Sequence, residues 1–156
     1  MTTPHYYVDK QELHEAMIAH LDRVKEARAA GKPDPQIPDY IGKAIINICV
    51  GLSMRYNFRG YTWRDEMVED GIAACIYAVN KYNPRHDGPN GTGPNPYGYF
   101  TQCAFWAFQS RIVREKTELA KRLAILKDFN EELVQQGMDG EVHDVDRESI
   151  IAMFEE

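Results

Sequence analysis

The sequence lacks the long apolar runs and the cysteine patterns of membrane and secreted proteins. No apolar run approaches the ~18 residues that a membrane-spanning helix requires, and the polar N-terminus does not resemble a signal peptide. Cys49, Cys75 and Cys103 are widely spaced, and each lies within an apolar pattern. A disulfide framework or a zinc site requires paired or tightly spaced ligands, so we predict buried thiols in a protein of the reducing cytoplasm.

Catalytic motifs are absent as well. The sequence contains no Gly-x-Ser-x-Gly, no phosphate-binding Gly-x4-Gly-Lys-Ser/Thr and no zinc-binding His-Glu-x2-His pattern. The histidines are scattered, and His14 and His20 fall on opposite faces of one predicted helix. The acids at 65–70 could hold a metal ion, but a solvated helix start explains them more simply. We therefore expect a protein that is not an enzyme and that uses no metal or cofactor.

The net charge of −6 hides a division along the chain. Residues 128–156 hold ten acids against Arg147, a net charge of −9, so residues 1–127 carry −6 − (−9) = +3. Within residues 97–127, six bases oppose two acids and give +4. A mildly basic body with a strongly acidic tail permits a polyanionic partner without requiring one.

Apolar residues recur at helical spacing, and no segment shows the alternation of a strand. The predicted fold class is all-α, a compact helical domain of four or five helices with a flexible acidic C-terminal tail. The helices are expected from about Asp9 to Gly31, from Asp39 to Tyr56, from Thr62 to Asn83 and from Asn95 onward. The last helix either ends late in the 110s or bends into a fifth segment that ends at Gly137.

Three regions follow from this pattern. Residues 1–36 form the first helix and a proline-containing connector, and residues 37–136 form the main helical domain. Residues 137–156 form an acidic linker and a short hydrophobic motif. Residues 85–96, rich in proline and glycine, predict a mobile loop inside the main domain.

The predicted fourth helix has two contrasting faces. The face expected in the core contains Phe100, Ala104, Ala107, Phe108 and Ile112. The opposite face collects Tyr99, Gln102, Trp106, Gln109, Ser110 and Val113. Aromatic rings stack on unpaired bases and glutamines bond to base edges, while the nearby Arg111, Arg114 and Lys116 suit phosphates. Periodicity alone does not decide between this surface and the alternative, in which Trp106 packs beneath another helix.

The third helix opens with acid beside acid. Asp65 with Glu69 and Glu66 with Asp70 are like-charge pairs at i,i+4, each costing an isolated helix a few tenths of a kcal/mol. A helix dipole favours acids in the first turn, which explains Asp65 and Glu66 better than the two later acids.

Three stretches, in order, resemble a known family. MVEDGIAACIYAVNKYNP, from Met67 to Pro84, is similar to region 2.2 of the bacterial sigma-70 family. YFTQCAFWAFQSRI follows where that family places its promoter-melting helix, and IGKAIINICVGLSMRYNFRGYTW precedes both. Together they resemble most the late-transcription sigma factors of T4-type phages, over about residues 38–116, half the chain.

The resemblance implies several macromolecular partners in the cytoplasm of a host bacterium. The acidic helix would dock on the clamp-helix coiled coil of the largest subunit of core RNA polymerase, whose bases would relieve the acid repulsion. The residues implied in this contact are Asp65, Glu66, Glu69, Asp70, Ile72 and Ile76. The second partner would be the non-template strand of an AT-rich −10-like promoter element.

For the DNA strand, the resemblance selects the same face as the helical periodicity. Tyr99 matches a family aromatic that helps to unpair the −10 element, and Gln102 and Cys103 stand where the family has paired tryptophans. Trp106 and Gln109 match two positions that contact the upstream part of the element. Arg111, Arg114 and Lys116 would lie near phosphates.

The segment after residue 127 is too short for a −35-reading helix-turn-helix domain. T4-type late sigma factors are similarly truncated, and they use a separate co-activator and the DNA sliding clamp. The resemblance implies that the final segment binds the clamp through Ile150, Ile151, Met153 and Phe154. The alternative is a terminal helix that folds back on the core.

Two other function classes remain open at this stage. One is a helical adaptor or inhibitor that binds polymerase without reading a promoter. The other is a repressor that places the helix over residues 99–116 in a major groove.

Overall fold

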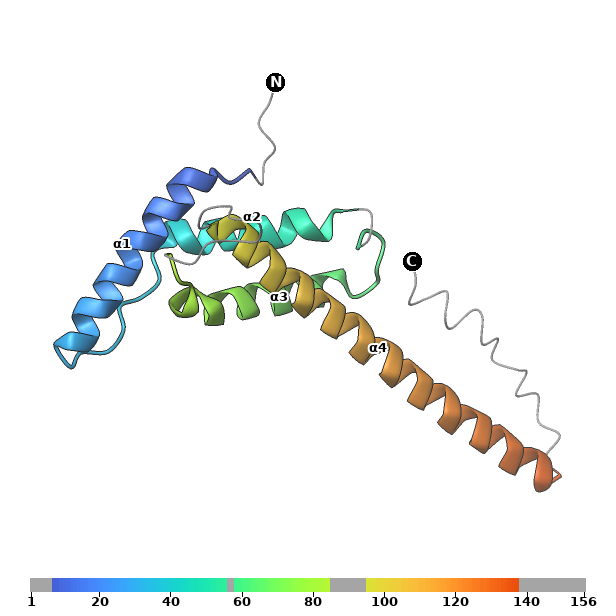
Figure 1. Ribbon diagram of the computed structural model, residues 1–156. Coiled ribbons are helices and arrows are strands. Elements are labelled where there is room, and N and C mark those ends of the chain that lie inside the picture. The colour runs from blue at the N-terminus through green and yellow to red at the C-terminus, as the bar shows by residue number, and fades with distance from the viewer. Residues whose placement is uncertain (1–6, 56–57, 85–94, 138–156) are drawn as a thin grey trace.

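The computed structural model describes residues 7–55, 58–84 and 95–137, and over these residues the protein is all-helical, without a strand. The predicted all-α class is therefore confirmed, while the predicted acidic tail lies outside the described residues. Four α-helices and one short 3-10 helix follow one another along the chain (Figure 1). They are α1 (Lys10–Ala29), α2 (Asp39–Ser53), α3 (Arg64–Ala78), η1 (Val79–Lys81) and α4 (Pro96–Gln135).

Two helix starts follow from local capping. The Asp9 carboxylate accepts a hydrogen bond from the backbone N–H of Glu12 at 2.9 Å, and α1 begins at the next residue. The Asn95 side-chain oxygen accepts from the N–H of Gly98 at 3.1 Å, with Pro96 in the first turn of α4. Both starts agree with the sequence-based prediction.

The predicted start of the third helix is wrong by one residue. α3 begins at Arg64 and its N-cap is Trp63, which makes no side-chain capping bond. Trp63 is buried, and its ring stacks on that of Tyr61 with centroids 4.5 Å apart. Burial of the indole thus sets where α3 begins, in place of the expected polar cap at Thr62.

α2 is shorter than predicted, since it ends at Ser53 and not at Tyr56. The Ser53 hydroxyl donates to the carbonyl of Val50 at 2.6 Å and accepts from the Arg64 guanidinium at 3.1 Å. These bonds join the end of α2 to the first residue of α3, so the turn between them starts early.

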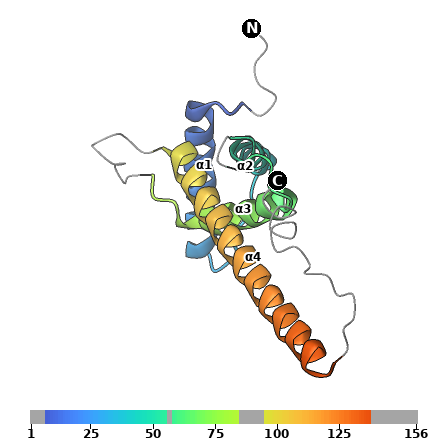
Figure 2. The ribbon, with the colours of Figure 1, turned by 90° about the vertical axis from the view of Figure 1, so that its right-hand side faces the viewer.

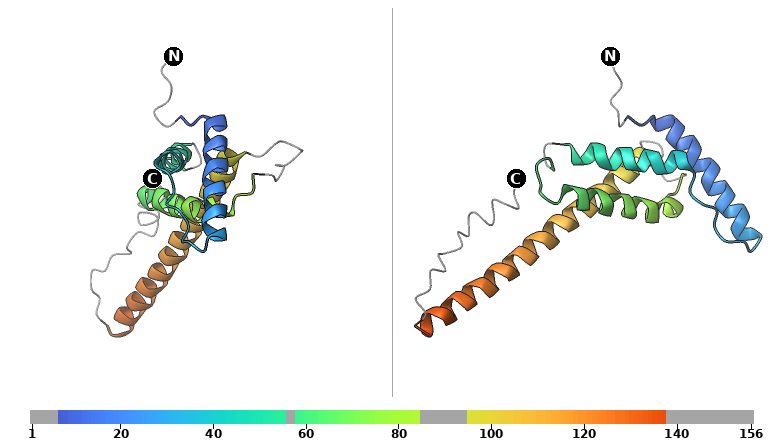
Figure 3. Two further views of the ribbon diagram at one scale, coloured as in Figure 1. Left: turned by 90° about the vertical axis from the view of Figure 1, so that its left-hand side faces the viewer. Right: turned by 180° about the vertical axis from the view of Figure 1, so that it is seen from behind.

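α4 is one unbroken helix of 40 residues, so the expected bend into a fifth segment is absent. At 1.5 Å per residue it is about 60 Å long. No proline or glycine follows Gly98 until Gly137, whose φ of 70° lies just beyond the helix end. Figures 2 and 3 show α4 passing the other helices and then continuing well beyond them.

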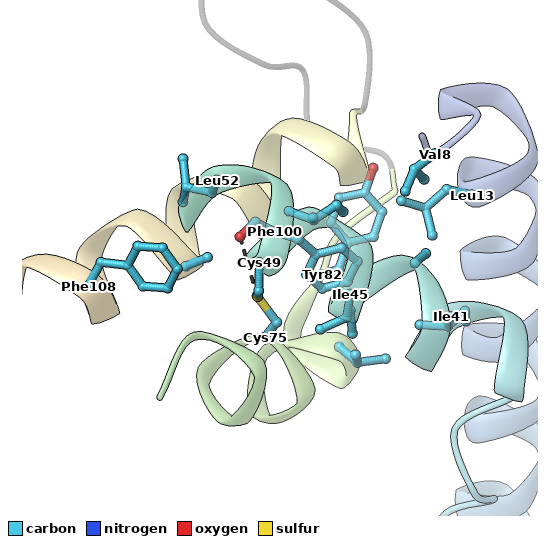
Figure 4. Packing of buried hydrophobic residues seen from close by; sticks show 14 of the residues in the cluster. Val8, Leu13, Ile41, Ile45, Cys49, Leu52, Cys75, Tyr82, Phe100 and Phe108 are labelled. Carbon is cyan, nitrogen blue, oxygen red and sulfur yellow. Dashed lines mark hydrogen bonds between the residues drawn. The ribbon is translucent and has the colours of Figure 1, made fainter. Parts of the chain in front are cut away.

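One hydrophobic cluster holds the helices together. Its buried residues include Leu13 and Met17 of α1, Ile41, Ala44, Ile45, Ile48 and Leu52 of α2, and Phe100, Ala104 and Phe108 of α4; Figure 4 shows several of them. Of the predicted α4 core face, Ala107 and Ile112 are only half-buried. The buried thiol of Cys75 donates to the carbonyl of Phe100 at 3.3 Å, so α3 and α4 are also joined by a hydrogen bond.

α3 lies very close to α4 at Gly71. A Cβ placed on Gly71 would lie 2.7 Å from a ring carbon of Phe108 and 3.3 Å from the sulfur of Cys49. The absence of a side chain at this position therefore allows α2, α3 and α4 to meet.

The cysteines are free and, as predicted, mostly buried: Cys49 and Cys75 are buried and Cys103 is half-buried. The neighbouring Cys49 and burial raise the pKa of the Cys75 thiol. No helix within residues 7–55, 58–84 and 95–137 has the length and apolarity to cross a membrane.

Candidate functional site

The side of α4 opposite its buried residues carries the predicted aromatic and amide groups. Trp106 is 57% exposed, and Gln102 and Gln109 are exposed one turn before and after it. We call these three residues the tryptophan surface. The alternative that Trp106 packs beneath another described helix is wrong.

Tyr99 does not belong to the exposed part of this face, contrary to the prediction. Its ring is half-buried, with centroids 5.2 Å from Tyr82 and 5.4 Å from Phe100. Its hydroxyl donates to the carbonyl of Ala78 at 3.2 Å, and burial raises its pKa. The chain leaving α3 lies beside the first turn of α4 and covers Tyr99. A helical wheel of α4 alone does not show this contact, because it contains no residue of that chain segment.

Arg111, which the sequence pattern assigned to phosphates, is paired with two carboxylates of the protein itself. Its Nε and Nη2 donate to the two carboxylate oxygens of Asp70 at 2.6 and 2.9 Å, and Nη1 donates to Glu115 at 3.1 Å. The Arg111 side chain is only 13% exposed. The hydrogen bond to Asp70, opposed by desolvation and aided by Glu115, raises the pKa of Arg111. Arg114 and Lys116 remain exposed, as predicted.

The same contact changes the interpretation of the acidic helix start. The bidentate pair with Arg111 neutralises Asp70, so the repulsion between Glu66 and Asp70 is offset inside the chain. The repulsion within this pair is therefore relieved without the polymerase bases that the sequence analysis expected to relieve it. Asp65, Glu66 and Glu69 are exposed and form no ion pair within the described part of the chain. We call these three residues the acidic surface.

Apolar groups continue the acidic surface along α3. Ile76 is 45% exposed, whereas Ile72 is half-buried and packs against the core. Tyr77, which sequence reasoning missed, is well exposed, with Lys81 Nζ 3.9 Å from its ring centroid. The hydrogen bond to Lys81 lowers the pKa of Tyr77. The exposed outer side of α3 therefore passes from acidic to apolar toward its C-terminal end.

A groove of about 250 Å³ between the end of α2 and the start of α4 was not predicted either. Its lining is mixed, with Asn47, Arg55 and Thr101 beside Ile48, Leu52 and Met54. Residues of two helices form it, so no single periodic pattern in the sequence could have indicated it.

Two predicted features lie outside the described residues: the loop over residues 85–94 and the final hydrophobic motif with Ile150, Ile151, Met153 and Phe154. Within the part that is described, no three His, Cys, Asp or Glu side chains are grouped so as to hold a metal ion.

The Arg111–Asp70 pair is expected to contribute measurably to stability. Arg111→Met and Asp70→Asn should each lower the free energy of unfolding by about 1–3 kcal/mol, since each leaves a partly buried charged partner unpaired. The double variant should lose less than the sum of the two, which urea denaturation of the four proteins would measure.

Lys127→Met is the matched control, because it removes only the exposed contact with Glu131 at 4.0 Å. It should change the free energy of unfolding by less than about 0.5 kcal/mol. A coupling energy near zero between Arg111 and Asp70 would show that the pair is not structural.

No protein-family model and no curated protein matches the chain. The resemblance to sigma factors therefore depends on the order of its three motifs.

Proposed function

We propose that this protein is a sigma factor of the phage late-transcription class, which binds bacterial core RNA polymerase and helps to melt an AT-rich −10-like promoter element. The observation that carries the proposal is the exposure of Trp106 between the exposed Gln102 and Gln109, on the side of α4 away from the core. Helical periodicity and the motif resemblance select this same face independently of each other.

The tryptophan surface has the chemistry for capturing unpaired bases. An exposed indole offers a flat face on which a base can stack, and such stacking contributes about 1–3 kcal/mol per base. The amides of Gln102 and Gln109 can donate to and accept from base edges on either side. Arg114 and Lys116 are exposed further along α4, where they can contact phosphates. Because unstacking the duplex costs about 1.4 kcal/mol per step, each captured base would offset part of the cost of opening.

Tyr99 and Arg111 take structural roles in this proposal. Tyr99 positions the first turn of α4 against Ala78, and Arg111 joins α4 to α3 through Asp70. Trp106 then becomes the principal stacking residue, and the phosphate contacts fall to Arg114 and Lys116.

The acidic surface supports the polymerase contact. Asp65, Glu66 and Glu69 present unpaired negative charge beside the exposed Ile76, an arrangement suited to a basic helical partner with an apolar centre. Asp70 is already paired, so it contributes less to docking than the motif alone implies. Tethering to the sliding clamp through Ile150, Ile151, Met153 and Phe154 is part of the same proposal, and a separate co-activator is compatible with it.

Run-off transcription with bacterial core polymerase on a template bearing only a −10-like element tests the function. We expect Trp106→Ala to bind polymerase normally and to reduce open-complex formation roughly tenfold or more, from the lost stacking. Ile125→Ala is the control, since Ile125 is also an exposed apolar residue of α4 but lies outside the tryptophan surface.

The rival functions give different results in this experiment. Polymerase binding without any promoter-dependent transcript would indicate an adaptor or inhibitor. Tight binding to closed duplex DNA without polymerase would indicate a repressor. Full promoter opening by Trp106→Ala would contradict the assignment of the tryptophan surface to DNA.

A further inference from the structure

The turn between α2 and α3 carries two arginines without an acidic partner. From Arg55 to Arg64 the chain contains three arginines and no aspartate or glutamate. Arg64 donates to the Ser53 hydroxyl at 3.1 Å. Arg55 and Arg59 are exposed, and neither side chain forms an ion pair or a hydrogen bond with another residue of the described part of the chain. Both guanidinium groups are therefore available to an anion.

The backbone holds these two arginines on one side of the turn. The N–H groups of Phe58 and Arg59 both donate to the carbonyl of Arg55 at 2.9 Å, as in a single turn of helix. Residues four apart in such a turn are neighbours, with Cβ atoms about 5–6 Å apart, and like charges at this spacing repel each other. A bound anion would relieve that repulsion, and the planar fork of a guanidinium matches the oxygens of a phosphate.

Phe58 fixes the turn against α4 at the edge of the tryptophan surface. It is buried, and its ring meets those of Phe105 and Phe108 edge-on, with centroids 5.6 and 5.2 Å apart. Phe105 directly precedes Trp106, and the two glutamines of the tryptophan surface lie three residues before and four residues after Phe105. Residues at these spacings are neighbours on a helix surface. Because Arg59 follows Phe58, it lies beside this part of α4, at the end of the body from which α4 projects (Figures 1 and 3).

Two further observations extend the basic side along α4. Arg55 lines the groove beside the start of α4 together with Thr101. The exposed Lys116 lies eleven residues after Phe105, which is about 20° around the helix axis at 3.6 residues per turn. Arg114, nine residues after Phe105, lies about 180° away. Lys116 therefore continues the side of α4 on which the turn packs.

We infer that Arg55 and Arg59 bind the phosphate backbone of the DNA strand whose bases stack on Trp106. Proteins that hold single strands combine aromatic rings for the bases with a positively charged track for the backbone. The tryptophan surface supplies the first part, and the arginine pair with Lys116 supplies the second. The inference rests on the proposed function and adds to it the path of the strand, which follows the α2 side of α4.

The salt dependence of DNA binding tests the inference. Fluorescence anisotropy of a labelled AT-rich DNA single strand would give the dissociation constant of the full chain over a range of salt concentrations. Each phosphate contact to a single strand contributes about 0.7 to the slope of log affinity against log salt, so Arg55→Gln with Arg59→Gln should reduce that slope by about 1.4. Trp106→Ala should weaken binding at every salt concentration and keep the slope, because stacking releases no counterions.

Arg23→Gln with Lys25→Gln is the matched control, since it removes two exposed positive charges from α1 and changes the net charge by the same amount. It should leave the slope unchanged. The variant with Arg55→Gln and Arg59→Gln should unfold at the same urea concentration as the native chain, because neither arginine belongs to the hydrophobic cluster. It should also co-purify normally with core polymerase.

The outcomes separate this inference from the proposed function. A slope that the arginine substitutions leave unchanged, or that the α1 control lowers equally, would overturn the inference while the tryptophan surface remains a base-binding site. An unchanged slope with lost co-purification would assign the arginine pair to polymerase instead. If the native chain bound no single strand, either alone or with core polymerase, the proposed DNA contact and this inference would both be wrong.

Discussion

Gly71→Leu is expected to leave the protein without a cooperative unfolding transition. A leucine at this position would direct its side chain from α3 into the buried ring of Phe108, which a Cβ alone would approach to 2.7 Å. The sulfur of Cys49 and the Cβ of Ala104 close the remaining sides at 3.3 and 3.5 Å. α3 could then accommodate the leucine side chain only by moving away from both α2 and α4.

Gly71→Ala should also destabilise the protein, but by less than Gly71→Leu. Overpacking of a filled core costs about 1–3 kcal/mol, and the better helix propensity of alanine returns at most about 1 kcal/mol. We therefore expect a lower midpoint in thermal or urea denaturation.

Gly42→Ala provides the matched control, because Gly42 lies inside α2 and a Cβ there meets nothing within 4 Å. It should gain stability of up to about 1 kcal/mol. If Gly71→Ala raised the unfolding midpoint as Gly42→Ala does, the close packing of α3 on α4 would be wrong.

Glu66→Lys combined with Glu69→Lys is expected to abolish co-purification with core RNA polymerase. Both side chains are exposed and belong to the acidic surface, so their reversal replaces attraction to a basic partner with repulsion. With about 1.4 kcal/mol or more lost per reversed charge, the dissociation constant should rise at least about a hundredfold. The fold should be retained, because neither residue contributes to the core.

Asp22→Lys with Glu26→Lys is the control for net charge, since it reverses two exposed acids on α1 and changes the total charge by the same amount. It should leave polymerase binding intact. Asp70 is omitted from the test because its reversal would break the contact with Arg111 and confuse folding with binding. Normal co-purification of the variant with Glu66→Lys and Glu69→Lys would show that the acidic surface does not bind polymerase.

The sequence alone determined the helical elements and their buried sides. The inward residues of α2 and the central ones of α4, Phe100, Ala104 and Phe108, follow from a spacing of three and four residues, which is a property of one helix. The caps at Asp9 and Asn95 are equally local, since donor and acceptor are three residues apart. Periodicity also places Trp106 opposite these buried residues on the same helix, but only the structure shows that no described helix covers it.

Only the tertiary structure decided which of the selected side chains are free to bind a partner. Arg111 and Asp70 are 41 residues apart, and no periodicity relates them, yet the packing of α3 on α4 joins them in a bidentate ion pair. Tyr99 is covered by the chain that leaves α3. The N-cap of α3 is the buried Trp63 and not a polar residue. A helix fixes the faces of its own residues, but a contact between helices depends on how they cross, and that depends on all their side chains together.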